Sequence, residues 1–365
     1  MSSILQVLPG FHTGGVEQTT LLVANALAEK GWKSFIASAK GILTESLHPD
    51  VVHIDLPLNS KNPLIMFSNV KELIKIIEGH SINIVHARSR APGWSAYFAA
   101  KSKDATFLTT YHGAYSQNFF KWYYNRVMTM GKLVVVASSY MENHVKKYYP
   151  SAECIKIPSG INTQYFSPEE ANVAQEQELK LLWGIKAYTK IILLVGRFTP
   201  IKGHQVLLQA LSKSIFKDQI KVVFVGDGKN PNFIEDLKGQ AAGCKLELHI
   251  HTDEKDLRPF FSVADVVVVP TTKPEAFGRV TVEAMSMSKL VIVNDLGASS
   301  EVLNDQDWVF DHCHVESLTQ KIDNALNLGT EQAQAVGAAN RMRASTLYDV
   351  DALVESHLQL YKRFL

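Results

Sequence analysis

Short apolar runs alternate with amphipathic stretches along most of the chain. In the first half, residues 4–8 form an apolar run typical of a buried strand, and residues 16–30 have the spacing of a helix that ends before Gly31. Similar apolar runs predict further strands at residues 33–38, 82–87, 105–111 and 133–137. Because helical stretches separate these strands, we expect βαβ units and a parallel sheet.

A second series of apolar runs fills the other half of the chain. It predicts strands at residues 191–195, 221–225, 245–249, 266–269 and 290–293. The segment between the two series, residues 158–178, contains Pro158, Gly160 and a polar run, and we interpret it as a linker. A chain of 365 residues is too long for one ordinary core. The sequence therefore predicts the α/β class, with two doubly wound Rossmann-like domains at residues 1–165 and 180–350.

Composition and charge exclude few classes of protein. Apolar residues make up 46% of the chain and charged residues 20%, an ordinary balance for a globular protein. Cys154, Cys244 and Cys313 lie far apart and suggest neither a disulfide framework nor a zinc site, so we expect a reducing cytoplasm. No apolar run is long enough to span a membrane, and residues 1–5 lack the features of a signal peptide.

The net charge of +1 conceals an asymmetry between the two halves. Residues 1–168 contain 16 Lys and Arg against 10 Asp and Glu, a balance of +6. A basic first half could attract an anionic acceptor or an anionic membrane face. Scattered surface charge explains the same excess equally well.

Two carboxylates, Glu275 and Glu283, flank a predicted helix start in the second half. Glu275 follows an expected buried strand, and Glu283 falls on the first turns of an expected helix at residues 281–287. Between them, Gly278 lets a ligand approach the backbone, and the N–H groups of the helix start suit a phosphate. One acid can hold sugar hydroxyls and the other ribose hydroxyls, so the pattern suits a sugar nucleotide. The alternative is that both glutamates are solvated surface charges.

Several glycine and basic motifs also follow predicted strands, in the order Gly14-Gly15, Gly196-Arg197, Lys202-Gly203 and Gly226-Asp227-Gly228. Together with the two glutamates, they resemble the motifs of retaining glycosyltransferases of family 4, from about residue 5 to residue 303. This likeness implies the GT-B fold, in which two facing domains enclose a cleft. It also implies that the first domain binds the acceptor, that the second binds the donor, and that a last helix at residues 351–365 packs on the first domain. The implied activity moves a hexose-type sugar from a nucleoside diphosphate, such as a UDP-sugar or a GDP-sugar, without a metal or other cofactor.

The resemblance also assigns roles to single residues. Arg197 and Lys202 would stabilise the charge of the leaving diphosphate in place of a metal ion, although two surface cations are the alternative. Glu275 would bind hydroxyls of the transferred sugar, and Glu283 would hold the ribose. His112 ends an expected strand and would contact the donor sugar or the acceptor hydroxyl, although a lone histidine is more often structural. The candidate catalytic residues are therefore Glu275, His112, Arg197 and Lys202, and further donor contacts are expected from Gly14, Gly15, Phe277, Gly278, Arg279 and Val280.

Residues 86–90 and 110–115 resemble a bacterial subgroup that builds cell-envelope or lipopolysaccharide glycans. Arg88 and Arg90 follow a predicted strand and are candidates for binding an anionic acceptor, with surface solvation as an equal alternative. Residues 119–126 interleave five aromatic side chains with Lys121 and Arg126. This stretch could touch a membrane surface or a lipid-linked sugar, but we favour a core helix. We expect a cytoplasmic protein with peripheral contact to the inner face of an anionic membrane, and no nucleic-acid partner.

Two other functions are compatible with the same fold. A non-catalytic sugar-nucleotide-binding protein is disfavoured because both acids and both cations of the resembled site are present. A dinucleotide-dependent oxidoreductase is disfavoured because Val16-Glu17 occupies the stretch where the dinucleotide fingerprint needs a third glycine.

Overall fold

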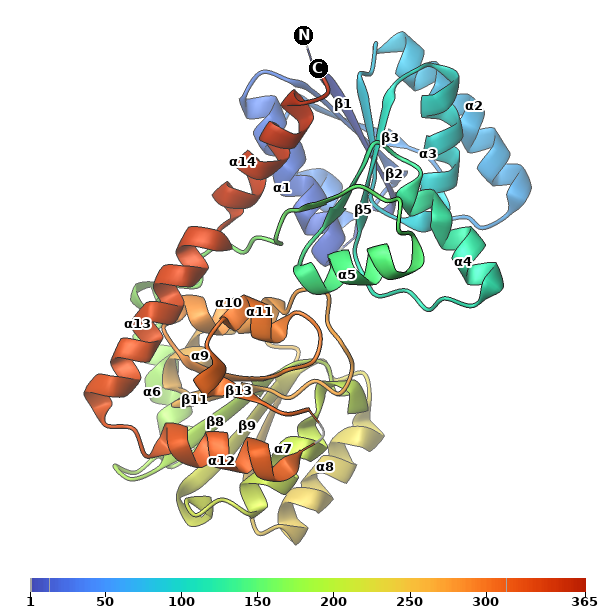
Figure 1. Ribbon diagram of the computed structural model, residues 1–365. Helices are drawn as coiled ribbons and strands as arrows, with labels where there is room; N and C mark the ends of the chain where they lie inside the picture. Colours follow the sequence, from blue (N-terminus) through green and yellow to red (C-terminus); the bar gives the residue numbers. More distant parts are fainter. Residues whose placement is uncertain (1, 13, 313) are drawn as a thin grey trace. The chain divides into compact units, whose positions relative to one another are not determined.

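The computed structural model describes residues 2–12, 14–312 and 314–365, and the chain divides into two compact units (Figure 1). Unit 1 consists of Met1–Gly160 and Val350–Leu365, and unit 2 consists of Ile161–Asp349. Cys313, one of the three cysteines considered above, lies outside the described residues. No helix in the described part of the chain has the length and apolar character that crossing a membrane requires.

Within the described residues, unit 1 contains a seven-stranded sheet in the order β3-β2-β1-β4-β5-β6-β7. All neighbouring strands are parallel. The strands are β1 (Ser3–Gly10), β2 (Lys33–Ala39), β3 (Val51–Asp55), β4 (Ile84–Ala87), β5 (Thr106–Tyr111), β6 (Leu133–Val136) and β7 (Cys154–Lys156). The helices are α1 (Gly15–Glu29), α2 (Pro63–Gly79), α3 (Arg90–Ser102), α4 (Phe119–Asn125), α5 (Ser139–Tyr148) and α14 (Val350–Lys362).

The sheet of unit 1 is buried on both faces. Leu5 of β1 and Val85 of β4 belong to a core cluster with residues of α2 and α3. Ile4 and Ile84, one position earlier in each strand, belong to a second cluster with residues of α1 and α14. Side chains alternate between faces along a strand, so uninterrupted apolar runs are what a sheet covered on both sides requires.

Within the described residues, unit 2 contains a six-stranded parallel sheet in the order β10-β9-β8-β11-β12-β13. The strands are β8 (Lys190–Val195), β9 (Ile220–Gly226), β10 (Glu247–Thr252), β11 (Val266–Val269), β12 (Leu290–Asn294) and β13 (Val309–Phe310). The helices are α6 (Val173–Leu182), α7 (His204–Ser212), α8 (Pro231–Gly243), α9 (Arg258–Val263), α10 (Arg279–Ser286), α11 (Ser299–Leu303), α12 (Val315–Leu326) and α13 (Thr330–Leu347).

In each unit the strand order reverses once, between β1 and β4 and between β8 and β11. Ligands of open α/β sheets bind outside the carboxyl ends of the strands at such a point. The predicted class, two doubly wound Rossmann-like domains, is confirmed. Every strand that the apolar runs predict is present, although β4 and β10 each begin two residues later than expected. The three strands that we did not predict, β3, β7 and β13, lie at sheet edges and are short or partly exposed.

The segment interpreted as a linker belongs mostly to unit 2, because that unit begins at Ile161. Thr163 donates its backbone N–H to Oδ2 of Asp349 at 3.2 Å, and its hydroxyl binds the same atom. The hydroxyl of Ser286 donates to the carbonyl oxygen of Phe166 at 2.6 Å. These bonds fasten part of the segment that we interpreted as a linker to unit 2.

Candidate functional site

The loop after β8 carries Lys202, and the loop after β11 carries Glu275. Nζ of Lys202 lies 2.5 Å from Oε1 of Glu275, and both side chains are mostly buried. Gly203 adopts a φ of 77°, and a Cβ there would lie 1.8 Å from the carbonyl oxygen of Pro270, just after β11. Only glycine therefore lets these two loops approach so closely. The structure thus brings together two of the residues predicted for catalysis.

Glycines also pack the strand ends beneath Lys202. A Cβ on Gly196 would lie 3.2 Å from both Cγ and Cδ of Lys202, so the lysine stem crosses this glycine. A Cβ on Gly226, at the end of β9, would lie 2.2 Å from the carbonyl oxygen of Gly196. Arg197 follows directly and is exposed. The carboxyl ends of β8 and β9 therefore present one partly buried cation and one exposed cation.

The amino end of α10 forms a polar seat in unit 2. Gly278 precedes the helix with a φ of 96°, and no side chain caps the helix start. A Cβ on Gly278 would lie 3.4 Å from Oγ1 of Thr281 and 3.7 Å from Oγ of Ser299. Both hydroxyl oxygens are buried without a hydrogen-bond partner in the described residues. Buried polar atoms are normally paired, so two unpaired hydroxyls beside the N–H groups of a helix start indicate a place for an anionic ligand.

Glu283 lies in the second turn of α10 and is buried, at 7% exposure. Its Oε1 lies 3.6 Å from Nη2 of Arg279, one turn earlier on α10. Burial raises the pKa of Glu283, and the charges of Arg279 and Lys202 oppose this rise. The alternative of a solvated surface glutamate is wrong, because the carboxylate is almost fully removed from water.

The loop that carries Glu275 is also held by the backbone of the loop after β12. Glu275 pairs with Gly297 in a parallel β-bridge, and Ala298 donates its N–H to the carbonyl oxygen of Glu275 at 3.0 Å. Gly297 has a φ of 75°, and a Cβ there would lie 2.6 Å from the backbone nitrogen of Glu275. The side chain of Phe277 is buried against Tyr348, with ring centroids 5.4 Å apart. Phe277 thus anchors the loop, and only its backbone remains a predicted donor contact, as for Val280.

In residues 2–12, 14–312 and 314–365, no group of three or more His, Cys, Asp or Glu side chains could hold a metal ion. That catalysis needs no metal stays a prediction.

In unit 1, His112 follows the end of β5. Its Nε2 atom is buried and has no hydrogen-bond partner within the described residues. Burial and the charge of Arg88 lower the pKa of His112 to about 3. The imidazole is therefore neutral near pH 7 and suits a hydrogen-bonding role better than that of a proton-donating acid.

Arg88 is almost fully buried, at 1% exposure, so the alternative of surface solvation is wrong. Its guanidinium donates to Oε1 of Gln6 at 2.5 Å and to Oγ1 of Thr110 at 3.3 Å, and it lies 3.3 Å from Nε2 of His357. The Nε atom of Arg88 has no partner among the described residues. His86 extends this network, since its Nδ1 lies 2.7 Å from the hydroxyl of Tyr361 on α14. Arg88 thus ties β4 to the last helix, and acceptor binding by Arg88 stays a prediction.

Arg90, at the start of α3, is partly buried under aromatic rings. It donates to Oδ1 of Asn125 at 3.0 Å, and its guanidinium carbon lies 4.0 Å from the centroid of the Tyr115 ring. This geometry is that of a cation–π contact. Gly14 has a φ of −177°, an extended conformation open to any residue, and Gly15 begins α1. Their predicted contact with the donor therefore rests on position alone.

The aromatic stretch at residues 119–126 corrects our interpretation of a core helix. Phe119 and Phe120 on α4 are 78% and 81% exposed, and Tyr123 is also exposed. Lys121 is exposed as well, and its Nζ donates to the hydroxyl of Ser116 at 3.0 Å. Alternating rings and cations lack a helical apolar stripe, and the structure places most of these side chains in solvent.

Comparison with known proteins agrees with this architecture. Residues 176–343 match the family described as glycosyl transferases group 1, and residues 13–165 match glycosyltransferase family 4. The crystal structure of a glycosyltransferase from Rickettsia africae is similar at 34% identity and a TM-score of 0.90, over 100% of this chain and 98% of that one. The chain belongs to the group 1 glycosyltransferases.

Two further proteins resemble this glycosyltransferase. The lipopolysaccharide 1,2-N-acetylglucosaminetransferase of Salmonella typhimurium is 28% identical over 181 residues, which are 47% of this chain and 46% of that protein. The alignment therefore spans about half of each chain. The structure of Anabaena HepE in complex with UDP has a TM-score of 0.82 at 19% identity, over 99% of this chain and 100% of that one. This second likeness concerns the fold.

Sequence analysis missed several polar groups of this glycosyltransferase. Thr281 and Ser299 line the seat at Gly278, yet threonine and serine near helix starts are common as caps. The signal that could have found Ser299 is its position after a short loop that follows β12, at the same edge of the sheet as Glu275. Gly297 was not singled out from the sequence, because its close approach to Glu275 depends on the folded loop.

Proposed function

We propose that this glycosyltransferase moves a hexose-type sugar from a nucleoside diphosphate to a cell-envelope or lipopolysaccharide glycan, with retention of the anomeric configuration. The observation that carries the proposal is the Lys202–Glu275 ion pair next to an unpaired, buried polar seat at Gly278. The helix start suits the diphosphate, the cation suits the oxygen that leaves with it, and the carboxylate suits hydroxyls of the sugar.

The diphosphate would lie at the amino end of α10. There the N–H groups of Arg279 and Val280, and the hydroxyls of Thr281 and Ser299, can donate to phosphate oxygens. Lys202 and Arg197 would face the oxygen that leaves with the diphosphate, where negative charge grows as the sugar bond breaks. Fixed cations stabilise such charge without a metal ion, and we propose metal-independent catalysis for this reason.

The two glutamates would hold the two ends of the donor. Glu275 shares its carboxylate with Lys202 and has a second oxygen for hydroxyls of the transferred sugar, whose anomeric carbon becomes positive. Glu283 is buried, and its only ion-pair partner in the described residues lies 3.6 Å away. A ribose diol can supply two hydrogen bonds to this carboxylate, which burial otherwise leaves poorly solvated.

In the proposed reaction, the bond between the anomeric carbon and the diphosphate oxygen breaks. The acceptor oxygen then bonds to the same face of that carbon, and its proton passes to the leaving phosphate. His112 is neutral near pH 7, so it would orient a hydroxyl by a hydrogen bond and leave the proton transfer to the phosphate. The envelope acceptor is supported by the likeness to the Salmonella lipopolysaccharide enzyme, and the nucleotide by the UDP complex on the same fold.

The test is a panel of nucleoside diphosphates and their sugars, screened first by thermal shift. A ligand at 100 times its dissociation constant stabilises a protein by about 2.7 kcal/mol, which a melting curve resolves. The best sugar nucleotide is then incubated with lipopolysaccharide-type acceptors, and the anomeric configuration of the product is read by NMR. Stabilisation without turnover on any acceptor would support a binding protein instead, and an inverted product would reject retention.

A further inference from the structure

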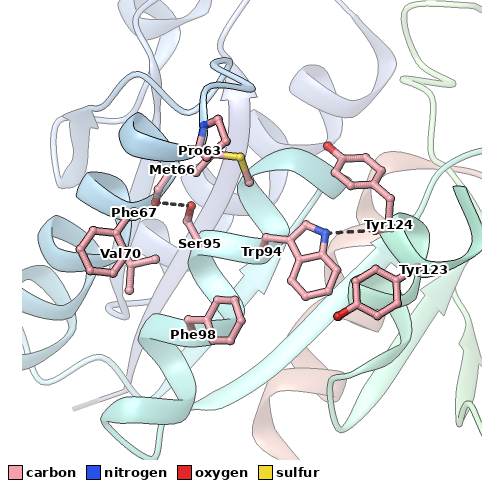
Figure 2. Close-up of a pocket in the computed structure, with 9 residues that line it drawn as sticks. All are labelled: Pro63, Met66, Phe67, Val70, Trp94, Ser95, Phe98, Tyr123 and Tyr124. Carbon is pink, nitrogen blue, oxygen red and sulfur yellow. Dashed lines mark hydrogen bonds between the residues drawn. The ribbon is translucent and has the colours of Figure 1, made fainter. Parts of the chain in front are cut away.

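An apolar pocket of about 420 Å³ lies in unit 1 between α2, α3 and α4 (Figure 2). Met66, Phe67 and Val70 line it from α2, Trp94 and Phe98 from α3, and Tyr123 from α4. Its volume falls in the range of about 300–1,000 Å³ that is usual for small-molecule sites. The pocket lies within one unit, and none of the candidate catalytic residues lines it. Tyr124, which does line it, lies near Arg90, a candidate for acceptor binding, whose guanidinium carbon is 5.8 Å from the centroid of the Tyr124 ring.

Two polar groups beside the pocket, the hydroxyl of Ser95 and the indole nitrogen of Trp94, are already paired. The hydroxyl of Ser95 donates to the carbonyl oxygen of Met66 at 2.9 Å, and Nε1 of Trp94 donates to the carbonyl oxygen of Tyr124 at 3.0 Å (Figure 2). The rings of Phe98 and Tyr123 stack on the two sides of Trp94, with centroids 6.0 Å away in each case. The pocket therefore presents carbon atoms and aromatic faces, which favour a hydrocarbon over a hydrogen-bonding ligand.

The rim of the pocket is apolar and open to water. Phe67 is 63% exposed and Phe98 is 50% exposed, and Leu64 on the first turn of α2 is also exposed. Phe119 and Phe120 continue the exposed aromatic surface along α4. Contiguous exposed apolar surface of this kind marks an interaction site more often than an ordinary monomer surface.

Basic residues outnumber acidic ones in the segment that forms the pocket. Residues 61–126, which include every residue that lines it, contain nine Lys and Arg and three Asp and Glu, a balance of +6. Nζ of Lys71 lies 5.0 Å from the centroid of the Phe67 ring, and Nζ of Lys101 lies 5.9 Å from that of Tyr97. Tyr97 itself packs edge-on against Phe98. Exposed cations therefore stand beside the rings that border the pocket.

We propose that this pocket admits one hydrocarbon chain of an anionic phospholipid when unit 1 docks on a bilayer. A bilayer presents anionic head groups above hydrocarbon, which is the order in which the protein presents cations at the rim and carbon below. Amphipathic Trp and Tyr rings at the boundary, such as Trp94 and Tyr123, suit the same interface. A protein partner would meet the same apolar rim only by supplying its own acidic border, whereas the lipid surface supplies both features together.

The decisive experiment uses Trp94 as a reporter inside the pocket. The full chain is mixed with vesicles of phosphatidylglycerol whose acyl chains carry bromine, which quenches indole fluorescence on close approach. Trp122 on α4 is partly exposed and is first replaced by Phe, so that it does not report on the same surface. In that background we expect quenching at low salt, and loss of most of that quenching when Trp94→Phe is added at equal vesicle binding. Neutral phosphatidylcholine vesicles with the same brominated chains should bind about tenfold more weakly.

Paired variants test the rim. Phe67→Ser combined with Phe98→Ser should lower the affinity for anionic vesicles about tenfold, since both rings are largely exposed and their loss spares the core. The matched control is Leu181→Ser with Ile215→Ser, two exposed apolar residues of unit 2, which should bind vesicles as the unchanged protein does. Melting curves of both double variants confirm that the fold is kept.

Three outcomes would overturn the proposal. Vesicle binding without quenching of Trp94 would show that the surface is held by charge alone. A change in the monomer–dimer equilibrium of the Phe67 and Phe98 variant, with vesicle binding unchanged, would assign the pocket to a second copy of the chain. Absence of vesicle binding would reject membrane docking. None of these measurements involves a nucleotide, so their failure leaves the proposed sugar transfer standing, and failure of sugar transfer leaves them interpretable.

Discussion

Nζ of Lys202 and Oε1 of Glu275 lie 2.5 Å apart, although 73 positions separate the two residues in the sequence. The pair forms where the loops after β8 and β11 meet, on either side of the point at which the strand order of unit 2 reverses. Each residue limits the positions open to the other, so removing one should disturb the other. A carboxylate that neutralises the lysine in the free protein can also turn to a substrate once a diphosphate neutralises the lysine instead.

Glu275→Gln tests this exchange of partners. We expect kcat to fall about 100-fold, on the scale of a lost charge-stabilising group, because the amide cannot stabilise positive charge at the anomeric carbon. The dissociation constant of the free nucleoside diphosphate should stay within about twofold, since Glu275 is assigned to the sugar. Steady-state kinetics and calorimetric titration measure the two quantities.

A double-mutant cycle adds a control to this prediction. Lys202→Ala and Glu275→Gln should be strongly non-additive in kcat, because residues in contact share their interaction energy. Glu247→Gln provides the matched change. Glu247 also pairs with a lysine, Lys221, but this pair lies at the amino ends of β9 and β10, whereas Lys202 and Glu275 follow the carboxyl ends of their strands. If Glu275→Gln turned over substrate at nearly the rate of the unchanged protein, the assignment of Glu275 to the site would be rejected.

Glu283→Gln should make unit 2 more stable and should weaken the binding of the nucleotide. Burial raises the pKa of Glu283 above its ordinary value, so the folded protein holds the ionised carboxylate at a cost near pH 7. The amide carries no charge, and it also loses the acceptor capacity assigned to the ribose diol. We expect a higher melting temperature for the variant at pH 7 and a dissociation constant for the nucleoside diphosphate that rises about tenfold or more.

The pH dependence fixes the sign of this effect. Below the ordinary pKa of a glutamate, about 4.3, the carboxyl is protonated in both folded and unfolded chains and costs nothing. As pH rises through the raised folded pKa, the unfolded chain releases the proton more readily, and the unchanged protein loses stability relative to Glu283→Gln. The gap in melting temperature should therefore open between acid and neutral pH. A gap that is constant with pH would contradict a raised pKa, and an unchanged nucleotide affinity would reject the ribose role.

The sequence predicted the charged residues of this site better than its buried hydroxyl groups. Lys202 and Glu275 stand in short motifs after apolar runs, and the shared edge of a parallel sheet brings such loops together without further information. Thr281 and Ser299 could not be singled out, because their significance lies in having no partner, which only packing decides. The edge strands β3 and β7 were missed because an edge strand needs no continuous apolar run.

The burial of Arg88 could not be predicted from the sequence, because its partners lie far apart along the chain. An arginine directly after a strand is most often solvated, because the cost of burying a charge is high. Here Gln6 and Thr110 accept its hydrogen bonds, and both lie on strands that are neighbours of β4 in the sheet. His357 comes from α14, more than two hundred positions later. No local pattern links these residues, so the network follows only from the strand order and from the return of the last helix.

Arg197→Ala should lower kcat by about tenfold to a thousandfold, with little change in stability, because the side chain is exposed and its proposed role is to stabilise the leaving diphosphate. EDTA should leave the activity of the unchanged protein largely intact if Arg197 and Lys202 act in place of a metal ion. The measurement is turnover with and without chelator, and with added Mg²⁺ or Mn²⁺. Strict dependence on either ion would contradict the assignment of these two cations.

His357→Gln tests the buried network of unit 1. Burial and the charge of Arg88 lower the pKa of His357 to about 3, and burial with the same charge lowers the pKa of His86 well below its ordinary value. These histidines are neutral when folded, whereas in the unfolded chain they bind protons below about pH 6.5. Stability is therefore fully present above pH 6.5 and falls as pH drops toward 3, by about 1.4 kcal/mol per pH unit for each proton taken up.

Removing one of these histidines should reduce the loss of stability that accompanies a fall in pH. At pH 5, urea unfolding of His357→Gln should take up about one proton fewer than unfolding of the unchanged chain, as counted by potentiometry. The groups that face His357 are Arg88, His86 and His112, with Tyr361 one turn further on α14, and none is an acid that could hold a proton on the folded imidazole. Glutamine keeps a polar side chain of similar reach, so the variant should fold at pH 7. An unchanged proton count would mean that His357 is already protonated in the folded protein, and that Arg88 does not keep it neutral.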